Sequence, residues 1–288
     1  MRQQLQISTE TGSFGKYYDN FETLKKLKEA GFNAYDFTMC GEPGKRDMFF
    51  YENDYIDRAK KLKKQAEEQG LICNQTHAPF PTVVVGNEEY NRKTYKDIVR
   101  AIEISGALGA RLCVVHPCNY YTPEQNAEIY RRFESVAKDN GVLIALENMW
   151  NWTEKENHAL PAACSDGDNF LKHLELLDDK VFVACLDLGH AEMFGLNTSA
   201  IEMIKKLGNR IKALHIHDND LHDDLHLAPF MSKMKFEPIF SELKGAGYNG
   251  DVTFEANGFL GKLPKEVFLS GLKYLLSAGQ YLRELLQY

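Results

Sequence analysis

The sequence lacks any apolar run near the roughly 20 residues that a membrane-spanning helix needs. Its first residues also lack the charged start and long apolar stretch of a secretory signal. Basic residues are outnumbered, with 34 Lys and Arg against 41 Asp and Glu, so the net charge is −7. A general nucleic-acid-binding protein needs a basic face for the phosphates, so this charge disfavours that class. We therefore expect a cytoplasmic protein with no membrane or nucleic-acid partner. A small anionic substrate stays compatible with the charge, because a bound metal can supply local positive charge.

The chain also lacks proline-, glycine- or serine-rich linkers and low-complexity tracts. One domain over residues 1–288 is expected, since a single α/β barrel typically takes about 250 residues. No two cysteines form a C-x-x-C pair, which favours free, buried thiols in a reducing cytosol. The six cysteines are Cys40, Cys73, Cys113, Cys118, Cys164 and Cys185.

Short β-rich runs that end in polar residues alternate with helical patterns along the chain. The predicted strands are Leu5–Thr9, Asn33–Thr38, Leu71–His77, Arg111–His116, Val142–Glu147, Val181–Asp187, Ile211–His217 and Val252–Glu255. The predicted helices are Phe21–Ala30, Ile56–Gln69, Asn87–Leu108, Pro123–Asn140, Asn169–Leu177, Ser199–Leu207, Phe236–Ala246 and Glu266–Leu286.

This alternation predicts an α/β fold, a single (β/α)8 TIM barrel, because eight strand–helix units with parallel crossovers close naturally into a ring. A doubly wound open sheet is the alternative, but no G-x-G-x-x-G follows the first strand. The stretch Trp150–Asp168 is expected to be an irregular loop on the active-site face. Glycines follow six of the helices, where a left-handed cap needs them, at Gly31, Gly70, Gly109, Gly141, Gly208 and Gly247.

The ends of the predicted strands carry the chemistry, because active sites of such barrels form at the C-terminal ends of the strands. Six successive strands bring residue types that bind metals to this one ring. The strand-end residues are His77, His116, Glu147, Asp187 followed by His190, His215 with His217, and Glu255.

Converging carboxylates would repel one another and would be costly to bury in ionised form unless a cation lay between them. We therefore predict that Glu147, Asp187, His215 and Glu255 hold a divalent metal ion. Mixed carboxylate and imidazole ligands suit Mn, Zn, Co or Fe, and also Mg. Taken singly, any of these residues could instead be structural, for example a strand-end histidine bonded to a backbone carbonyl.

Other residues have two readings that the sequence leaves open. Asp224 and His226 could add ligands after the seventh strand, or belong to a solvated acidic loop together with His222. Trp150 and Trp152 could form an aromatic wall for a sugar ring, or could pack in the core. His158 and His173 are expected at the surface.

The chain resembles the xylose isomerase-like barrel superfamily, the sugar phosphate isomerase/epimerase group that also contains endonuclease IV. The segments that carry the resemblance are Ala145-Leu146-Glu147-Asn148, Leu186-Asp187-Leu188-Gly189-His190, Leu214-His215-Ile216-His217-Asp218, His226-Leu227-Ala228-Pro229-Phe230 and Thr253-Phe254-Glu255.

The resemblance implies that Glu147, Asp187, His215 and Glu255 hold one metal, as in the ketose 3-epimerases, with the two glutamates moving protons. His190 matches the family's substrate-contacting histidine, whereas Leu221 stands where the epimerases have an arginine. The three-zinc set of endonuclease IV is also matched in residue type. Its positions here are His77, His116, Glu147, Asp187, His190, His215, Asp224, His226 and Glu255.

The function expected from these observations is a metal-dependent sugar or sugar-phosphate isomerase/epimerase. It would act by proton transfer α to a carbonyl through an enediolate. An inosose-type dehydratase on the same site and an endonuclease IV-like multi-zinc phosphodiesterase are the alternatives, and a non-catalytic sugar- or metal-binding barrel is the third. A homo-oligomer is expected from the resemblance alone.

Overall fold

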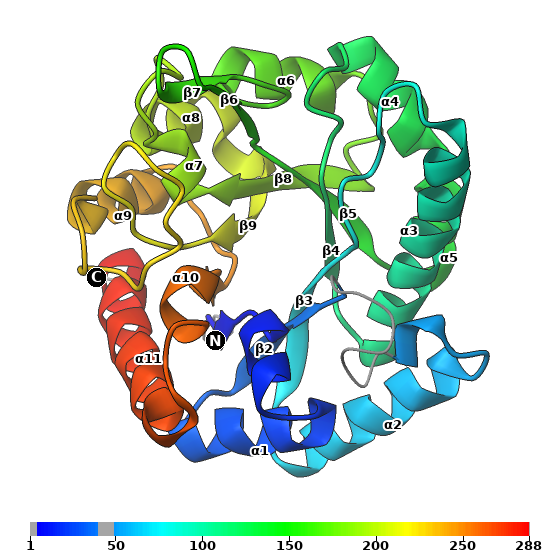
Figure 1. Cartoon of the computed structure of the whole chain (residues 1–288), viewed down its shortest axis with the longest axis vertical. Coiled ribbons are helices and arrows are strands. Elements are labelled where there is room, and N and C mark those ends of the chain that lie inside the picture. The colour runs from blue at the N-terminus through cyan, green and yellow to red at the C-terminus, as the bar shows by residue number, and fades with distance from the viewer. Residues whose placement is uncertain (1–4, 40–48, 288) are drawn as a thin grey trace.

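Eight parallel strands, in one six-stranded and one two-stranded sheet, are arranged in a ring, and helices surround it on the outside (Figure 1). The computed structural model describes residues 5–39 and 49–287. The strands of the ring are β1 (Ile7–Thr9), β2 (Ala34–Thr38), β3 (Ile72–His77), β4 (Leu112–Val115), β5 (Leu143–Glu147), β8 (Phe182–Asp187), β9 (Ile211–His215) and β10 (Val252–Phe254). Each of the eight predicted strands is therefore confirmed, with ends that shift by one or two residues.

Hydrogen bonding orders the ring as β2-β3-β4-β5-β8-β9, with β1 and β10 paired separately. Both seams between these two sheets carry parallel bridges, one joining Glu10 to Asp36 and the other joining Ile216 to Phe254. The two strands of the smaller sheet, β1 and β10, have only three residues each. This order places sequence neighbours side by side, as right-handed strand–helix–strand units do.

Helices follow the strands as the sequence predicts, with one exception. They are α1 (Asn20–Ala30), α2 (Tyr55–Glu68), α3 (Glu88–Leu108), α4 (Pro123–Arg131), α5 (Glu134–Asn140), α6 (Gly167–Glu175), α8 (Ala200–Leu207), α9 (Phe236–Gly245) and α11 (Lys265–Gln287). The prediction of a single helix over Pro123–Asn140 is wrong, because this segment divides into α4 and α5. At the break the N–H of Phe133 bonds to the carbonyl of Tyr130, and the buried Phe133 ring stacks on Tyr95.

The predicted irregular loop at Trp150–Asp168 is also wrong, because it contains an antiparallel hairpin. Its strands are β6 (Trp150–Thr153) and β7 (His158–Pro161). Two one-turn helices that the sequence did not predict, α7 (Leu188–Ala191) and α10 (Asn257–Leu260), follow β8 and β10. All three additions lie after the carboxyl ends of ring strands, and so on the face where the functional side chains gather.

The six predicted glycine positions all have left-handed or otherwise positive φ angles. Gly31, Gly109 and Gly141 are the caps of α1, α3 and α5, with φ of 103°, 80° and 65°. Glycine adopts this conformation without the strain that a Cβ atom causes, so these residues end the helices sharply before each strand.

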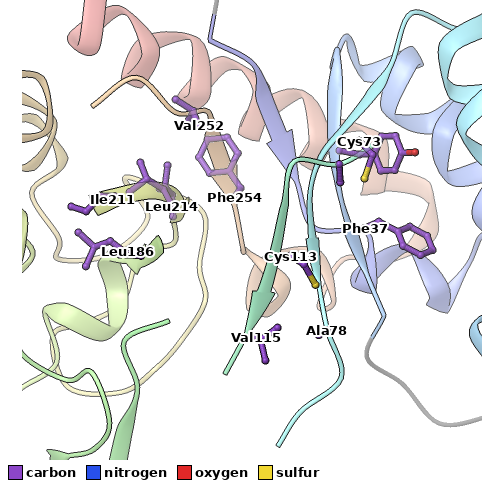
Figure 2. Close-up of a cluster of buried hydrophobic side chains, with 14 of the residues drawn as sticks. Phe37, Cys73, Ala78, Cys113, Val115, Leu186, Ile211, Leu214, Val252 and Phe254 are labelled. Carbon is purple, nitrogen blue, oxygen red and sulfur yellow. The ribbon is translucent and has the colours of Figure 1, made fainter. Parts of the chain in front are cut away.

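The alternation of side chains along the strands places the functional residues inside the ring. Leu146, Leu186, Leu214 and Phe254 point outward into the apolar layer between strands and helices, part of which is drawn in Figure 2. The next residue in each strand therefore points inward, because successive side chains alternate between faces. These next residues are Glu147, Asp187, His215 and Glu255.

A small apolar cluster, formed by Val114, Ala145, Val183, Cys185 and Ala213, fills the ring below them. The five described cysteines are free and buried, as predicted, whereas Cys40 lies outside the described residues. Within residues 5–39 and 49–287, none of the helices has the length and apolarity to cross a bilayer.

Candidate metal centre

The four residues predicted as metal ligands meet at the C-terminal end of the ring. Glu147, Asp187, His215 and Glu255 each offer a ligand atom, and these atoms all lie within 4.8 Å of one another. The first three are almost completely buried, while the side chain of Glu255 is 16% exposed. The group therefore has a closed inner side and one open side, toward Glu255, where a substrate could approach.

Further ligand groups adjoin this one, and one of them, His77 with His215 and Glu255, shares two of its residues. His77 and His116 lie with Glu147 in a second group, and His190, His217, Asp224 and His226 form a third. Glu147 belongs to two groups at once: Oε1 lies 3.1 Å from Nδ1 of His215, and Oε2 lies 3.1 Å from Nε2 of His116. The structure thus brings together every strand-end residue that the sequence singled out.

Several ligand atoms in these groups are buried without a hydrogen-bond partner. Among the described residues they include Oε2 of Glu147, Oδ2 of Asp187, Oδ1 of Asp224 and both ring nitrogens of His217. A buried polar atom that lacks a partner costs free energy, and a cluster of them around carboxylates is the environment that a divalent cation satisfies. The donor set of imidazoles and carboxylates fits Zn, Mn, Co or Fe.

Three histidines are oriented by the backbone. Nδ1 of His77 donates to the carbonyl of Ala78 at 2.8 Å, Nδ1 of His190 to that of Asn148 at 2.9 Å, and Nδ1 of His226 to that of Glu255 at 2.8 Å. A proton held at Nδ1 leaves Nε2 with a free lone pair. In each case Nε2 is the nitrogen that remains available to a metal ion.

Asp36 supports His215 in a way that the sequence analysis missed. It lies on β2, fully buried, with Oδ2 3.8 Å from Nε2 of His215 and 3.1 Å from the amide nitrogen of Gln75, which donates to it. At 3.8 Å this contact is electrostatic and not a hydrogen bond, and a nearby carboxylate raises the basicity of an imidazole. Nδ1 of His215 then faces Glu147 and Glu255, the side on which an ion would lie.

Asn148 fastens β5 to the end of β8. Its side-chain oxygen accepts from the N–H of Asp187 at 2.7 Å, and its side-chain amide donates to the carbonyl of Asp187 at 2.9 Å. Asp187 in turn accepts from the N–H of His190 and so caps α7. Glu147, which precedes Asn148, is therefore held at a fixed position relative to Asp187.

Gly189 is required by close packing. A Cβ atom at this position would lie 2.0 Å from Cε1 of His217. The ring of His217 lies directly over the glycine and stacks on His226, with ring centroids 3.9 Å apart. The Asp187-Leu188-Gly189-His190 motif therefore provides a ligand, a helix cap, space for a neighbouring ring, and a second histidine.

Carboxylates and imidazoles within the cluster shift one another's pKa values. Burial alone would raise the pKa of Glu147, but His215 and His116 hold this pKa well below its usual range. Burial lowers the pKa of His226, but the hydrogen bond that Nε2 of His226 donates to Asp224 outweighs this effect and raises the pKa to about 9. His226 therefore holds its proton more firmly than a free imidazole does, and a metal ion that binds there must displace this proton.

Aromatic side chains stand around the mouth of the site. Phe80, 52% exposed, stacks on His116 with ring centroids 4.6 Å apart, and it escaped the sequence analysis. Its position in His77-Ala78-Pro79-Phe80, just beyond a strand end, is the signal that could have found it. Trp150 lies edge-on to His190 at 6.4 Å, whereas Trp152 packs against Trp150 and His222. Trp150 thus borders the site and Trp152 supports it.

Three other residues complete the comparison with the sequence. The surface position predicted for His173 is wrong, because His173 is buried and bonds to Asn126 and to the carbonyl of Asn169. His158 is half-buried on β7. Leu221, at the position of the epimerase arginine, packs against the apolar core and contributes no charge to the site.

The chain has relatives among known proteins and solved structures. It is 25% identical over 244 residues to an uncharacterised protein of Methanocaldococcus jannaschii, covering 81% of this chain and 78% of that protein. It is 28% identical over 173 residues to a probable endonuclease 4 of Cenarchaeum symbiosum, covering 55% and 59% of the two chains. The crystal structure of a D-tagatose 3-epimerase-like protein superposes with a TM-score of 0.72 at 22% identity, covering 97% and 98%. At this identity the structural likeness concerns the fold.

A family model also matches most of the sequence. The match extends over residues 24–277, which includes seven of the eight ring strands and all the ligand groups described above. The chain belongs to the xylose isomerase-like TIM barrel family.

Proposed function

We propose that the protein is a metal-dependent sugar or sugar-phosphate isomerase/epimerase. The observation that carries this proposal is the pair of carboxylates, Glu147 and Glu255, which come from β5 and from the end of β10 and reach one ligand group. Their partners Asp187 and His215 leave the Glu255 side open. Two carboxylates at one metal can serve both as ligands and as proton carriers.

In this proposal one of the two glutamates removes a proton α to the substrate carbonyl, and the other returns a proton to the opposite face or to the neighbouring carbon. Burial alone would raise the pKa of Glu147, but His215 and His116 lower it, so its carboxylate is ionised before a substrate binds. When bound, a divalent cation supplies the positive charge that polarises the carbonyl and stabilises the enediolate. His190 and Trp150 would position the sugar.

The family and the fold support this proposal, since the D-tagatose 3-epimerase-like structure has the same architecture. Leu221 sets a limit on it, because no arginine reaches the site from that position. The substrate would therefore be recognised differently from that of the arginine-bearing 3-epimerases. Elimination of a hydroxyl group next to the same carbanion would make the enzyme an inosose-type dehydratase.

The test is incorporation of solvent deuterium into recovered substrate. Metal-loaded protein would be incubated in D₂O with a panel of keto-sugars, sugar phosphates and inososes, and carbon-bound deuterium would be measured by NMR and mass spectrometry. We expect exchange with at least one substrate, and Glu255→Gln should slow it by about 10²–10⁴-fold. A product that contains one water molecule less than the substrate would identify the dehydratase. Absence of exchange across the panel would remove the proposal.

A second candidate, an endonuclease IV-like multi-zinc phosphodiesterase, is favoured by a specific observation. The three adjoining ligand groups, two of which share Glu147, can accept three ions, and metal clusters of this kind stabilise the attacking and leaving oxygens of phosphoryl transfer. The net charge of −7 opposes binding to a DNA backbone. We therefore place this candidate second.

Elemental analysis combined with an activity assay separates the two candidates. Metal content per chain would be measured after loading with Zn²⁺, and the same protein would be incubated with a duplex that contains an abasic site. Three ions per chain together with strand cleavage would establish the hydrolase. One ion per chain and an uncut duplex would remove it.

A further inference from the structure

A second cavity lies at the N-terminal end of the strand ring, opposite the metal centre. Its volume is about 460 Å³, which falls within the range of small-molecule sites. Residues that begin strands line it, including Ile72 of β3, Leu112 of β4 and Leu143 of β5, and so does the segment 249–251 before β10. None of the residues that line this cavity belongs to the ligand groups of the metal centre.

Two β-bulges supply polar side chains to this cavity. The pairing of β2 with β3 passes from Cys73 to Gln75 and skips Asn74, and the pairing of β8 with β9 passes from Ile211 to Ala213 and skips Lys212. Both skipped residues line the cavity. Cys73 and Ile211, which precede them, belong to the apolar layer between strands and helices, and Figure 2 shows both. Each bulge therefore adds one inward-facing polar residue, which regular alternation would not provide.

The polar groups of the cavity are unequally satisfied. Asp251 is engaged, because Oδ1 accepts from the N–H of Gln6 at 2.8 Å and Oδ2 accepts from the amide of Asn74 at 3.1 Å. Asn74 is buried, with only 9% of its surface exposed, and its Oδ1 has no hydrogen-bond partner. Among the described residues, Arg111 and Lys212 form no ion pair. The cavity therefore offers two cations and one buried acceptor.

We propose that this cavity is a second ligand site, which binds a small hydroxylated organic anion such as a sugar phosphate or a sugar acid. Lys212 and Arg111 would hold the anionic group, and Oδ1 of Asn74 would accept from a hydroxyl. Ile72, 45% exposed although it is apolar, would contact the carbon skeleton together with Leu112. The proposal does not depend on the reaction at the metal centre, because the two sites lie at opposite ends of the ring.

Calorimetric titration of the full chain tests this proposal. The probes are D-glucose 6-phosphate and D-gluconate, with D-glucose as the uncharged control and inorganic phosphate as the control without carbon-bound hydroxyls. The variants are Lys212→Met, which keeps an apolar stem, and Arg111→Gln. Lys172→Gln, an exposed lysine on α6 that lies outside the cavity, is the matched control.

We expect the phosphorylated sugar or the sugar acid to bind more tightly than glucose and more tightly than inorganic phosphate. Lys212→Met should weaken binding about tenfold, and the more exposed Arg111→Gln about threefold, while Lys172→Gln leaves it unchanged. A stronger response to the phosphate probe or to the carboxylate probe identifies the anionic group. Thermal melting of each variant shows that it is folded.

The proposal would be overturned if neither anionic probe bound, or if both cavity variants bound them as the parent does, since that would place the binding elsewhere. Equal affinity for glucose would show that the anion does not matter. Equal affinity for inorganic phosphate would show that the hydroxyl groups do not contribute to binding. Either of these results also contradicts the proposal.

Discussion

Nε2 of His116 lies 3.1 Å from Oε2 of Glu147, and this contact joins two ligand groups into one centre. The other oxygen of Glu147 faces His215. Substitution of Glu147 should therefore affect two ion positions, whereas substitution of His116 should affect only one.

The first prediction compares Glu147→Gln with His116→Asn. Glu147→Gln removes the charge that both groups share, so metal binding should fall in both. His116→Asn should keep the ion held by Glu147, Asp187, His215 and Glu255. Metal content per chain, measured by elemental analysis, decides between these outcomes. Equal metal content in the two variants would show that Glu147 is not shared.

The second prediction concerns Asp187 and His190. Asp187→Ala should strip the metal and lower the melting temperature, because it removes a ligand and also the cap of α7, which alone costs about 1 kcal/mol. His190→Ala should retain at least one metal but lose turnover or substrate affinity. Metal content and thermal melting of both variants are the measurements. If Asp187→Ala kept tightly bound metal while His190→Ala had none, the roles proposed for the two residues would be wrong.

The third prediction tests the close packing at Gly189. Gly189→Ala places a methyl group where the ring of His217 lies, and it should destabilise the fold by about 1–3 kcal/mol. Gly245→Ala is the control, since Gly245 belongs to α9 and its Cβ would meet open space. This change should stabilise the protein by about 0.4–1 kcal/mol. Denaturant unfolding measures both, and similar values for the two would contradict the packing argument.

The fourth prediction concerns Phe80. Because Phe80 is half exposed and stacks only at the mouth of the site, Phe80→Ala should leave stability within about 0.5 kcal/mol. It should raise KM several-fold with little change in kcat, since it removes an apolar contact made equally by substrate and transition state. Steady-state kinetics on the substrate found by deuterium exchange checks this. A fall in kcat at constant KM would show that Phe80 instead positions His116.

The fifth prediction follows from the pKa of His226, which the Asp224 hydrogen bond raises from 6.5 to about 9 against the effect of burial. A folded pKa above the unfolded value stabilises the metal-free protein below about pH 6.5, and this contribution is lost as pH rises through about 9. The melting temperature of metal-free protein should therefore fall over this interval, while metal affinity rises as the proton leaves Nε2. In His226→Asn both pH trends should be weaker, and unchanged trends would assign them to another group.

The sequence predicted the ring of functional residues because two regularities coincide there. Strand side chains alternate, and Leu146, Leu186, Leu214 and Phe254 are each followed by a polar residue that must then face inward. The identity of these residues as carboxylates and imidazoles indicated a metal. Their role as ligands stays a prediction.

The parts that were missed depend on partners from distant segments. Asp36 lies within an apolar strand and acquires a function only because Gln75 and His215 come beside it from other strands. The bulges at Asn74 and Lys212 depend on register between strands, which local pattern does not specify. The burial of His173 depends on Asn126 of α4 in the same way. Short-range patterns contain none of this information.

The clasp formed by Asn148 has a consequence for how ions are exchanged. Its two hydrogen bonds to the backbone of Asp187 continue the pairing of β5 and β8 past the last strand residues and use no metal. The carboxylates of Glu147 and Asp187 should therefore keep their spacing whether or not an ion is bound. Little conformational entropy is then lost when the ion binds. An arriving ion then has only to shed its water and displace protons, so the rate of metal uptake should follow desolvation chemistry rather than a folding step.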